Sequence, residues 1–570
     1  MKEKCGAWVK NKVIISIFRK VQFLWLSYRK RSLKRNMQKF YNRYTSDITE
    51  ESDLILFWIP GGMSLLLHIE AAIAGALKLR GKRVHAIICD GLYKACIRRE
   101  ITDNIPIEEW ASLCKSCKAE CSSTLEQLGI EYSFVGDYVT PQEMKEAASA
   151  AKSAIWKSTK SIVFKGILVG INIQSAIYRY LRGADLPQNE QIVKEYTYSA
   201  NIVTIAAQNA ITRLKPKQVF MSHGIYVDWG PAMQVAVAND IPVTCYMGSY
   251  LPYRFYLRTL TDYQEIDFHN LTEDAWNKIK NQELTKAQSQ RLDHYLDDRY
   301  QRDSSFDMKE FKPFVGDKFK KSAFLNTFGM DTTKPTVAIL AHINWDAVSD
   351  YSSMLYDNFN DWIIDTIHTI TNVTNVQWLL KVHPAEAWDN PDTGVEVLVK
   401  QHFPTLPDHI KVISATENIN PLDFFSMIDA AVTCYGTSGL ELALQGKAVI
   451  LAGHAHYGRK GFTQDAYTIE EYHSLLQNVN SYNKLTIAQK ELARRYAYCY
   501  FIQRQIPLAI VENPKSKWWE FQFNKKELLL PGRDPVIDFI CDRIVDGDDF
   551  IMSDELAVAT NTKFSDINYS

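Results

Sequence analysis

A glycine-rich turn in the C-terminal third of the sequence has the residue types of a phosphate site. It follows an apolar run and reads CYGTSGLE, from Cys434 to Glu441. Such a turn at a helix start presents backbone N–H groups and the positive end of the helix dipole, and Thr437 and Ser438 add hydroxyl donors. Glu441, one turn into the helix, can accept bonds from ribose hydroxyls. The same spacing also forms a capping box, with Ser438 at the N-cap, which needs no ligand.

A histidine-proline turn lies about fifty residues earlier in the same part of the chain. The run WLLKVHPAE reads as a strand that delivers His383 to its carboxyl end, where Pro384 stops the ladder. A ring N–H of His383 can bond a phosphate oxygen, and Lys381 can add positive charge. A turn histidine is also commonly structural, but two such turns that both follow strands of one domain favour a nucleotide-phosphate site.

A third loop, GHAHYGRKGFT, follows the apolar run AVIL and concentrates cationic and aromatic side chains. His454 and His456 have the spacing of a metal pair, but no acidic or cysteine partner is near, so a metal is disfavoured. We expect Tyr457, Arg459 and their neighbours to recognise a phosphate or a sugar carboxylate. The alternative is an ordinary surface loop.

In the first half of the chain, the run FMSHGIYVDWG places two titratable residues between an expected strand and an expected helix. His223 ends the strand and Asp228 begins the helix. A carboxylate at such a position can act as a general base or a nucleophile, so Asp228 is a candidate for either role and His223 is a second candidate for direct chemistry. Asp228 is equally suited to be a helix N-cap.

Five of the ten cysteines fall within 33 residues, at Cys89, Cys96, Cys114, Cys117 and Cys121. The Cys114-x-x-Cys117 pair can chelate, and Cys96 and Cys121 can complete four ligands of a structural zinc or iron–sulfur site. The regular spacing of two paired zinc ligands is absent, so buried thiols are the alternative.

Strands, glycine turns and helices must position these residues, and their order predicts two α/β blocks. The first contains LILFWIP, a helix ending near Gly81 and RVHAIICDG, then KQVFMSHG, a helix and PVTCYMG. The second begins near Pro335 and contains TVAILAHI, VQWLLKVHPAE, IKVIS, AAVTCYG and KAVILAG. We expect two Rossmann-like domains facing across a cleft, with ligands at the carboxyl ends of strands.

The expected domain boundaries follow the changes in pattern along the chain. They are a basic amphipathic segment (1–50), an N-terminal Rossmann-like domain with helical insertions (51–320), a C-terminal Rossmann-like domain (321–500), C-terminal helices (501–548) and a disordered tail (549–570). At 570 residues the chain is too long for one core.

Charge is distributed unevenly. The whole chain has a net charge of -1, which argues against a dedicated nucleic-acid binder, yet residues 1–50 carry 13 Lys and Arg against 3 Asp and Glu. Basic and apolar residues alternate there, which suits a helix on an anionic membrane; a solvated helix packed on the protein body is the alternative. The longest apolar run near the start is interrupted by Arg19 and Lys20, so no transmembrane helix or signal peptide is expected. We therefore expect a cytoplasmic protein, peripheral to the inner membrane, whose cysteines are mostly thiols or ligands.

Together, the three C-terminal motifs resemble the bacterial capsule polysaccharide biosynthesis proteins, which include 3-deoxy-manno-octulosonic acid (Kdo) transferases and related lipopolysaccharide glycosyltransferases. The match is firmest over about 335–465 and is looser in the first block. The matching positions are Thr437, Ser438, Gly439, Leu440 and Glu441, then Gly446, Lys447 and Val449, then Tyr457, Gly461 and Thr463.

This resemblance implies a glycosyltransferase of GT-B fold, with the nucleotide-sugar donor on the second domain and a lipid-linked glycan acceptor on the first. It favours CMP-Kdo as the donor and chemistry that requires no metal. The alternatives are a nucleotide-sugar epimerase or a glycerophosphotransferase on the same fold, or a non-catalytic factor for capsule assembly or export.

Overall fold

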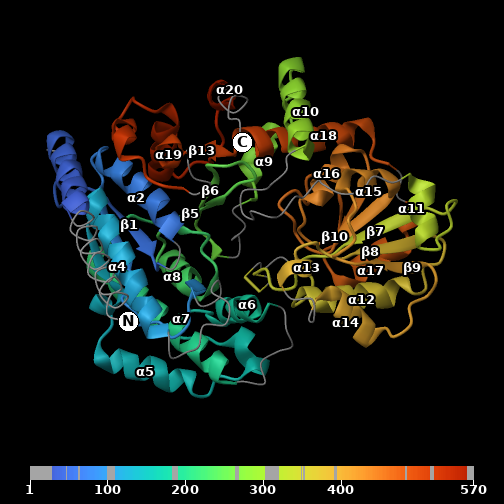
Figure 1. Cartoon of the computed structure of the whole chain (residues 1–570), viewed down its shortest axis with the longest axis horizontal. Coiled ribbons are helices and arrows are strands. Elements are labelled where there is room, and N and C mark those ends of the chain that lie inside the picture. The colour runs from blue at the N-terminus through green and yellow to red at the C-terminus, as the bar shows by residue number, and fades with distance from the viewer. Residues whose placement is uncertain are drawn as a thin grey trace, which may run out of the picture.

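The chain folds into two α/β domains, each built on a largely or wholly parallel sheet (Figure 1). The computed structural model describes residues 28–45, 48–61, 64–98, 110–182, 190–263, 269–301, 320–347, 349–350, 354–389, 394–481, 484–513 and 519–561. The prediction of an α/β fold with two Rossmann-like domains is confirmed.

The first sheet has seven strands in the order β13-β6-β5-β4-β1-β2-β3. Strands β1 to β5 are parallel, and β6 and β13 add an antiparallel edge. The order 3-2-1-4-5 within the parallel part is that of a Rossmann-like half-sheet. The strands are β1 (Leu54–Ile59), β2 (Arg83–Ile88), β3 (Tyr132–Phe134), β4 (Gln218–Ser222), β5 (Val243–Gly248), β6 (Arg254–Leu260) and β13 (Ile506–Pro507).

Both faces of this sheet are covered, which explains why its central strands are apolar runs and not alternating ones. All six side chains of β1 are buried: Ile55, Phe57 and Ile59 pack in the cluster that contains α2, and Leu56 and Trp58 pack in the cluster that contains α7 and α8. The helices of this domain are α2 (Ser64–Lys78), α4 (Trp110–Leu128), α5 (Pro141–Ala151), α6 (Gly170–Leu181), α7 (Glu190–Leu214), α8 (Tyr226–Val237), α9 (Glu273–Ile279) and α10 (Lys286–Gln301).

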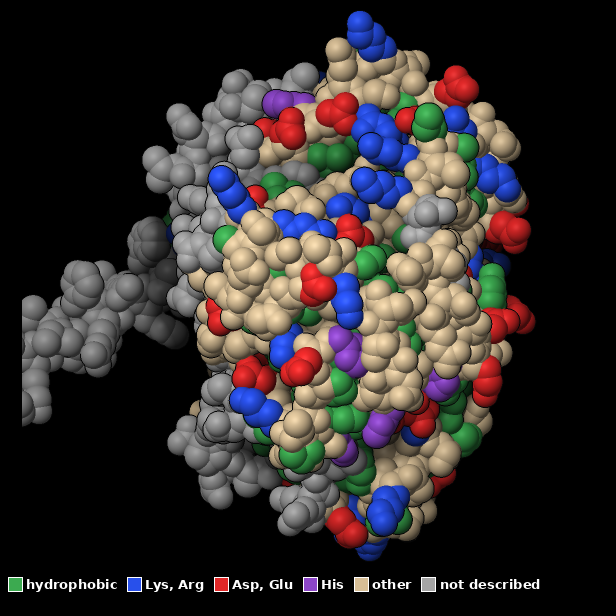
Figure 2. Space-filling view, turned by 90° about the vertical axis from the view of Figure 1, so that its right-hand side faces the viewer, with side chains coloured by type: hydrophobic (Ala, Val, Ile, Leu, Met, Phe, Trp, Pro, Cys, Tyr) green, Lys and Arg blue, Asp and Glu red, His purple; other side chains and the backbone are tan. Residues whose placement is uncertain are grey.

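The second sheet has six parallel strands in the order β12-β11-β10-β7-β8-β9. The strands are β7 (Thr336–Leu340), β8 (Gln377–Lys381), β9 (Ile410–Ile413), β10 (Ala430–Thr433), β11 (Ala448–Leu451) and β12 (Gln464–Asp465). The helices are α11 (Lys321–Thr327), α12 (Phe359–Ile370), α13 (Glu386–Asp389), α14 (Val395–His402), α15 (Pro421–Met427), α16 (Ser438–Leu444) and α17 (Ile469–Gln477). On the outer surface of this second domain, basic and acidic side chains are interspersed (Figure 2).

After the second domain the chain returns to the first. Helix α18 (Ile487–Tyr498) continues into a π-helical segment (Cys499–Gln503), and β13 then pairs with β6. Helix α19 (Pro535–Asp546) packs against α2, so the predicted C-terminal helices belong to the first domain and complete its sheet (Figure 1).

The predicted disorder of the tail is wrong for residues 549–561. Phe550, Met552 and Ala557 are buried, and α20 (Asp554–Asn561) is helical because its apolar side reaches the core of the first domain. Residues 562–570 lie outside the described residues.

Only part of the basic N-terminal segment is described. Residues 28–44 form a helix whose side chains Met37, Phe40 and Tyr41 are buried against the first domain. Residues 1–27, which hold most of the predicted amphipathic run, lie outside the described residues. Within the described part of the chain, no helix is long and apolar enough to cross a bilayer.

Strand β6 was not predicted, because its sequence RFYLRTL carries two arginines. Arg254 is 1% exposed, and its guanidinium donates to the carbonyl oxygens of Gln505 and Thr560. Those acceptors lie about 250 and 300 residues away in sequence, so the sequence around β6 does not reveal that Arg254 has buried hydrogen-bond partners. A buried charge that is hydrogen-bonded in this way is tolerated inside a sheet.

Candidate functional site

Residues that follow the carboxyl ends of the strands in one sheet contact residues that follow the carboxyl ends of the strands in the other. Tyr226, just beyond β4, donates its backbone N–H to the Asp350 carboxylate at 3.4 Å. Tyr250, just beyond β5, shares a hydroxyl–hydroxyl bond with Thr437, just beyond β10. Because ligands of such sheets bind at carboxyl ends, this meeting place is the candidate site.

Two histidines occupy equivalent places after neighbouring strands of the second sheet. His342 follows β7 and His383 follows β8. The His342 ring stacks on Phe359, with centroids 4.6 Å apart, and its Nε2 atom is buried without a hydrogen-bond partner among the described residues. That nitrogen faces the glycine-rich turn, since a Cβ added to Gly436 would lie 3.9 Å from it. A buried ring nitrogen without a protein partner is available to a ligand or a water molecule.

The proton position on His383 follows from its hydrogen bonding. The Ala385 backbone N–H donates to His383 Nδ1 at 3.2 Å, so this nitrogen is an acceptor and the proton of the neutral ring lies on Nε2. Burial, together with the nearby His342 and Lys381, lowers the pKa of His383 to about 4, and Asp346 opposes this shift. His383 therefore presents a neutral N–H donor at physiological pH. His342 also has a pKa lowered to about 4 by burial.

Lys381 ends β8 on the same side of the strand as His383. Burial lowers its pKa to about 8, and Glu417 opposes that shift. The ammonium group stays mostly charged at neutral pH, as the predicted phosphate site requires.

Asp346 and Arg179 were not predicted as site residues. Burial raises the pKa of Asp346, while Arg179 and His383 lower it, so the three side chains are electrostatic neighbours. Arg179, on α6, also donates to the Tyr226 hydroxyl at 2.7 Å. Position after a strand, which led to His383, is the signal that could have identified His342 and the loop that holds Asp346.

The turn at Gly436 differs in detail from its prediction. The N-cap of α16 is Thr437 and not Ser438, and no side-chain cap bond forms. The predicted capping box is therefore wrong. The backbone amides of Thr437 and Ser438 are not used by the helix, as at any helix start, whereas Gly439 donates its amide to the Gly436 carbonyl at 3.0 Å.

Glu441 has a protein partner in place of the predicted ribose. It is 2% exposed, and Arg299 of α10 donates to its Oε1 atom from Nε at 3.0 Å and from Nη2 at 2.9 Å. The guanidinium also lies over the Tyr250 ring, 4.3 Å from its centroid. This buried ion pair ties α10 to α16, so the ribose assignment of Glu441 is not supported.

Tyr457 packs against the Gly436 turn as a structural support and was predicted instead to contact a ligand. It is fully buried, and its hydroxyl donates to the Gly436 carbonyl at 2.6 Å. Arg459 is exposed, with its guanidinium 4.2 Å from the Tyr467 ring centroid and its backbone N–H bonded to Asp465. Arg459 lies near His454, whose pKa burial lowers to about 4.

The contact between Tyr457 and Gly439 leaves no room for a side chain. A Cβ at Gly439 would lie 2.0 Å from the Tyr457 hydroxyl oxygen, so we expect Gly439→Ala to lower the unfolding free energy by about 3 kcal/mol. Thermal melting would measure the loss. Adding Tyr457→Phe removes the nearest atom. The double variant is therefore expected to lose less unfolding free energy than the two single variants lose in sum. Simple additivity would contradict this account.

The two first-domain candidates have different surroundings. His223 lies at the end of β4, edge-on to Trp229 at 4.6 Å, and burial with Arg179 lowers its pKa to about 3. Its buried Nδ1 has no hydrogen-bond partner among the described residues, so His223 remains a site candidate. Asp228 is 1% exposed, and its Oδ2 accepts the Ile97 amide at 2.9 Å. That bond fixes the loop after β2, which favours a structural role for Asp228 over the predicted catalytic one.

Asp350 links the domains through a buried polar network. Its Oδ1 accepts from Tyr263 at 3.0 Å and from Asn172, and its backbone N–H donates to Ser175 at 3.1 Å. Tyr226, whose N–H reaches the same carboxylate, has the left-handed φ of 61°, a strained conformation for a tyrosine.

This network predicts a pH dependence. Burial raises the pKa of Asp350 to about 6, above its usual value near 4, so the folded protein holds this proton more tightly than the unfolded chain. The resulting stability is present at pH 4 and is lost as the pH rises through 6, by up to about 3 kcal/mol. Asp350→Asn cannot ionise, so its melting temperature relative to wild type should rise from pH 4 to pH 7. A difference independent of pH would refute this.

The cysteines group differently from the predicted set. Cys89, Cys96, Cys114 and Cys117 line one cavity, whereas Cys121 is buried and hydrogen-bonded to Cys117. In the described part of the chain, no three His, Cys, Asp or Glu side chains are placed to hold a single metal ion. The predicted ligand set Cys96, Cys114, Cys117 and Cys121 is thus not assembled around one ion.

Comparison with known proteins agrees with the resemblance of the second domain. Residues 332–492 match the family of capsule polysaccharide biosynthesis proteins, which confirms that resemblance over this block. No protein of curated function matches the chain. Among solved structures, a beta Kdo 2,4 transferase, KpsC of Thermosulfurimonas dismutans, is 16% identical, with 55% of this chain and 87% of that chain covered and a TM-score of 0.34. The UDP-GlcNAc 2-epimerase of Neisseria meningitidis is 11% identical, with 78% of this chain and 96% of that chain covered and a TM-score of 0.25. Likenesses this remote assign no residue or substrate to this chain.

Proposed function

We propose that this protein is a glycosyltransferase that moves a sugar from a nucleotide-sugar donor to a bacterial surface polysaccharide. The observation that carries the proposal is the placement of His342, His383 and the Gly436 turn after three adjacent parallel strands. All three lie at the carboxyl end of the second sheet, where Thr437 of the turn bonds Tyr250 of the first domain. The family match of residues 332–492 supports capsule polysaccharide as the product.

In this proposal the second domain binds the donor phosphates. His383 donates from Nε2, Lys381 supplies charge, and the amides of Thr437 and Ser438 add donors. Gly439 leaves room for the Tyr457 hydroxyl, which holds the turn in place through the Gly436 carbonyl. Such fixed donors stabilise the charge that develops on a departing nucleotide. Glu441 is left out of the donor site because Arg299 holds it.

The carboxylate that activates the acceptor hydroxyl is proposed to be Asp346 in place of Asp228. A general base works best when its pKa lies near the working pH, and burial raises the pKa of Asp346 from its ordinary range. Arg179 and His383 lie close enough to lower that pKa in turn, which places Asp346 beside the phosphate donors. Asp228 is occupied by the Ile97 amide.

A thermal-shift screen against CMP, UDP, GDP, ADP and their sugars tests the donor site. A ligand at 100 times its dissociation constant stabilises the folded state by about 2.7 kcal/mol, which shifts the melting temperature measurably. We expect a cytidine nucleotide to give the largest shift, with CMP-Kdo as the donor. Turnover of a free UDP-sugar without acceptor would instead identify an epimerase, and no shift with any nucleotide would refute the glycosyltransferase proposal.

The exposed side of the helix over residues 28–44 supports peripheral membrane binding at the inner membrane. Its outward side chains include Lys30, Arg31 and Arg35. Each basic residue near an anionic surface contributes about 1 kcal/mol of binding. We expect reversal of these three charges to glutamate to lower the affinity for vesicles containing phosphatidylglycerol by more than 10-fold in a sedimentation assay.

The matched control reverses three exposed lysines elsewhere, Lys286, Lys484 and Lys490. This control should leave vesicle binding nearly unchanged. Equal losses in the two variants would show that only net charge matters, and no loss in either would contradict membrane association through this helix.

A further inference from the structure

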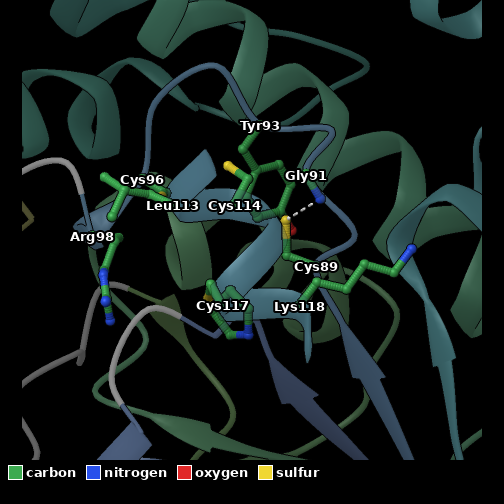
Figure 3. A pocket seen from close by; sticks show the side chains of 10 residues that line it. Cys89, Gly91, Tyr93, Cys96, Arg98, Leu113, Cys114, Cys117 and Lys118 are labelled. Atoms are coloured by element: carbon green, nitrogen blue, oxygen red, sulfur yellow. Dashed lines mark hydrogen bonds between the residues drawn. The ribbon is translucent and has the colours of Figure 1, made fainter. Parts of the chain in front are cut away.

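Four cysteines surround one cavity at the carboxyl edge of the first sheet (Figure 3). Cys89 comes directly after β2, and Cys96 lies seven residues further along the same loop. Cys114 and Cys117 are three residues apart on α4, a spacing that puts both on one face of the helix. The cavity therefore joins a loop and a helix that are about 20 residues apart in sequence.

The loop is fixed by buried partners on the neighbouring helices. The Ser199 hydroxyl of α7 accepts the backbone amides of Lys94 at 3.0 Å and of Ala95 at 2.9 Å. Asp228 of α8 accepts the amide of Ile97. These three bonds lie on both sides of Cys96, so its position is determined by the fold.

Glycines let the backbone approach the sulfur atoms closely. A Cβ at Gly61, beyond β1, would lie 3.1 Å from the Sγ atoms of both Cys117 and Cys121. Gly91 has a left-handed φ of 97° and lies against Cys114, whose Cβ would be 3.6 Å from an added side chain. Glycine thus stands at two places where the backbone passes close to these cysteines.

Two other uses of these thiols fit less well. A reactive nucleophile needs a lowered pKa, whereas burial raises the pKa of Cys89 to about 12. A single zinc ion needs four ligands within one tetrahedral shell, and no three candidate ligands among the described residues are that close.

We propose that Cys89, Cys96, Cys114 and Cys117 bind a [4Fe–4S] cluster in this cavity. Each thiolate of such a cluster binds a different iron, so four thiols around a common space suit it better than they suit one ion. Binding replaces the proton on each sulfur with iron, so each ligating thiol releases its proton. Arg98 also lines the cavity, so a basic residue borders the space that the negatively charged, thiolate-bound cluster would occupy. The site lies on the first domain and does not depend on the proposed donor site.

The ligand set differs from the one expected from spacing, since Cys89 takes the place of Cys121. The cluster would pin the loop after β2 to α4. Its role is structural, because none of the groups assigned to sugar transfer lines the cavity.

The test is iron, acid-labile sulfide and zinc analysis of the full-length protein, purified without oxygen and after anaerobic reconstitution with ferrous iron and sulfide. We expect about four iron and four sulfide per chain, with visible absorbance of a thiolate-bound cluster. One zinc per chain without iron, or no metal after reconstitution, would overturn the proposal.

Single serine variants test the ligands. Cys89→Ser and Cys114→Ser should lose most of the iron, while Cys121→Ser, the neighbour on the same helix, should retain it. Retention in Cys89→Ser with loss in Cys121→Ser would overturn the proposed set. Because a variant can fail to fold, the wild-type protein gives a second readout: the four thiols should resist alkylation with the cluster bound and react after chelation. Equal alkylation in both states would refute the proposal.

Discussion

His383→Ala is expected to lower sugar transfer by about 100-fold, the effect of losing one charge-stabilising donor in a site closed to water. The Nε2 proton is fixed by the amide that bonds Nδ1, so the wild-type ring is oriented before any ligand arrives. Without the His383 ring, the departing phosphate has one hydrogen-bond donor fewer. Steady-state kinetics with the donor identified by the thermal-shift screen would measure the loss.

Exposed His402 of α14 supplies the matched control for this substitution. His402→Ala should keep wild-type activity. Because burial lowers the pKa of His383 to about 4, wild-type donor binding should also stay constant between pH 5.5 and 8 as far as this residue is concerned. Activity of His383→Ala within twofold of wild type would remove His383 from the site.

Glu441→Ala is expected to destabilise the protein by about 3–5 kcal/mol, since it leaves the Arg299 guanidinium buried without its counter-ion. A guanidinium keeps its proton inside proteins, so Arg299 cannot relieve this by becoming neutral. Thermal or urea unfolding of the single variants would show the loss. Replacing both residues, with Arg299→Met and Glu441→Leu, should cost less than either truncation alone.

Two further comparisons separate this structural role from ribose binding. Breaking the exposed pair of Lys400 and Glu396 should cost less than about 1 kcal/mol. If Glu441 bonded a ribose hydroxyl, Glu441→Gln would reduce the preference for ribonucleotides over 2′-deoxyribonucleotides. An unchanged preference with lowered stability is the result expected here.

Much of the fold was predictable because parallel strands buried on both faces are continuous apolar runs. The strands β1, β2, β4, β5, β7, β8, β10 and β11 coincide with such runs, each followed within a few residues by glycine or histidine. The turns after β8 and β10 were predictable for the same reason. His383 and the Gly436 turn were therefore found without knowledge of the tertiary structure.

What could not be predicted depends on partners distant in sequence. Arg299 and Glu441 are 142 residues apart, and nothing in the local sequence around either one indicates that they form an ion pair. The same applies to Asp350, which meets Asn172 across 178 residues. Spacing favoured Cys121 as a ligand because it is near Cys117, but one more helical turn carries it away from the cavity and into the core.

The return of the chain to its first domain has a consequence for the order of synthesis. Residues 320–498 are inserted between parts of that domain, and its edge strand β13 and helix α19 follow the insertion. Domains fold as units while the chain leaves the ribosome. The second domain therefore has all its strands and can fold first, whereas the first domain, although started earlier, closes its sheet only when the last seventy residues emerge.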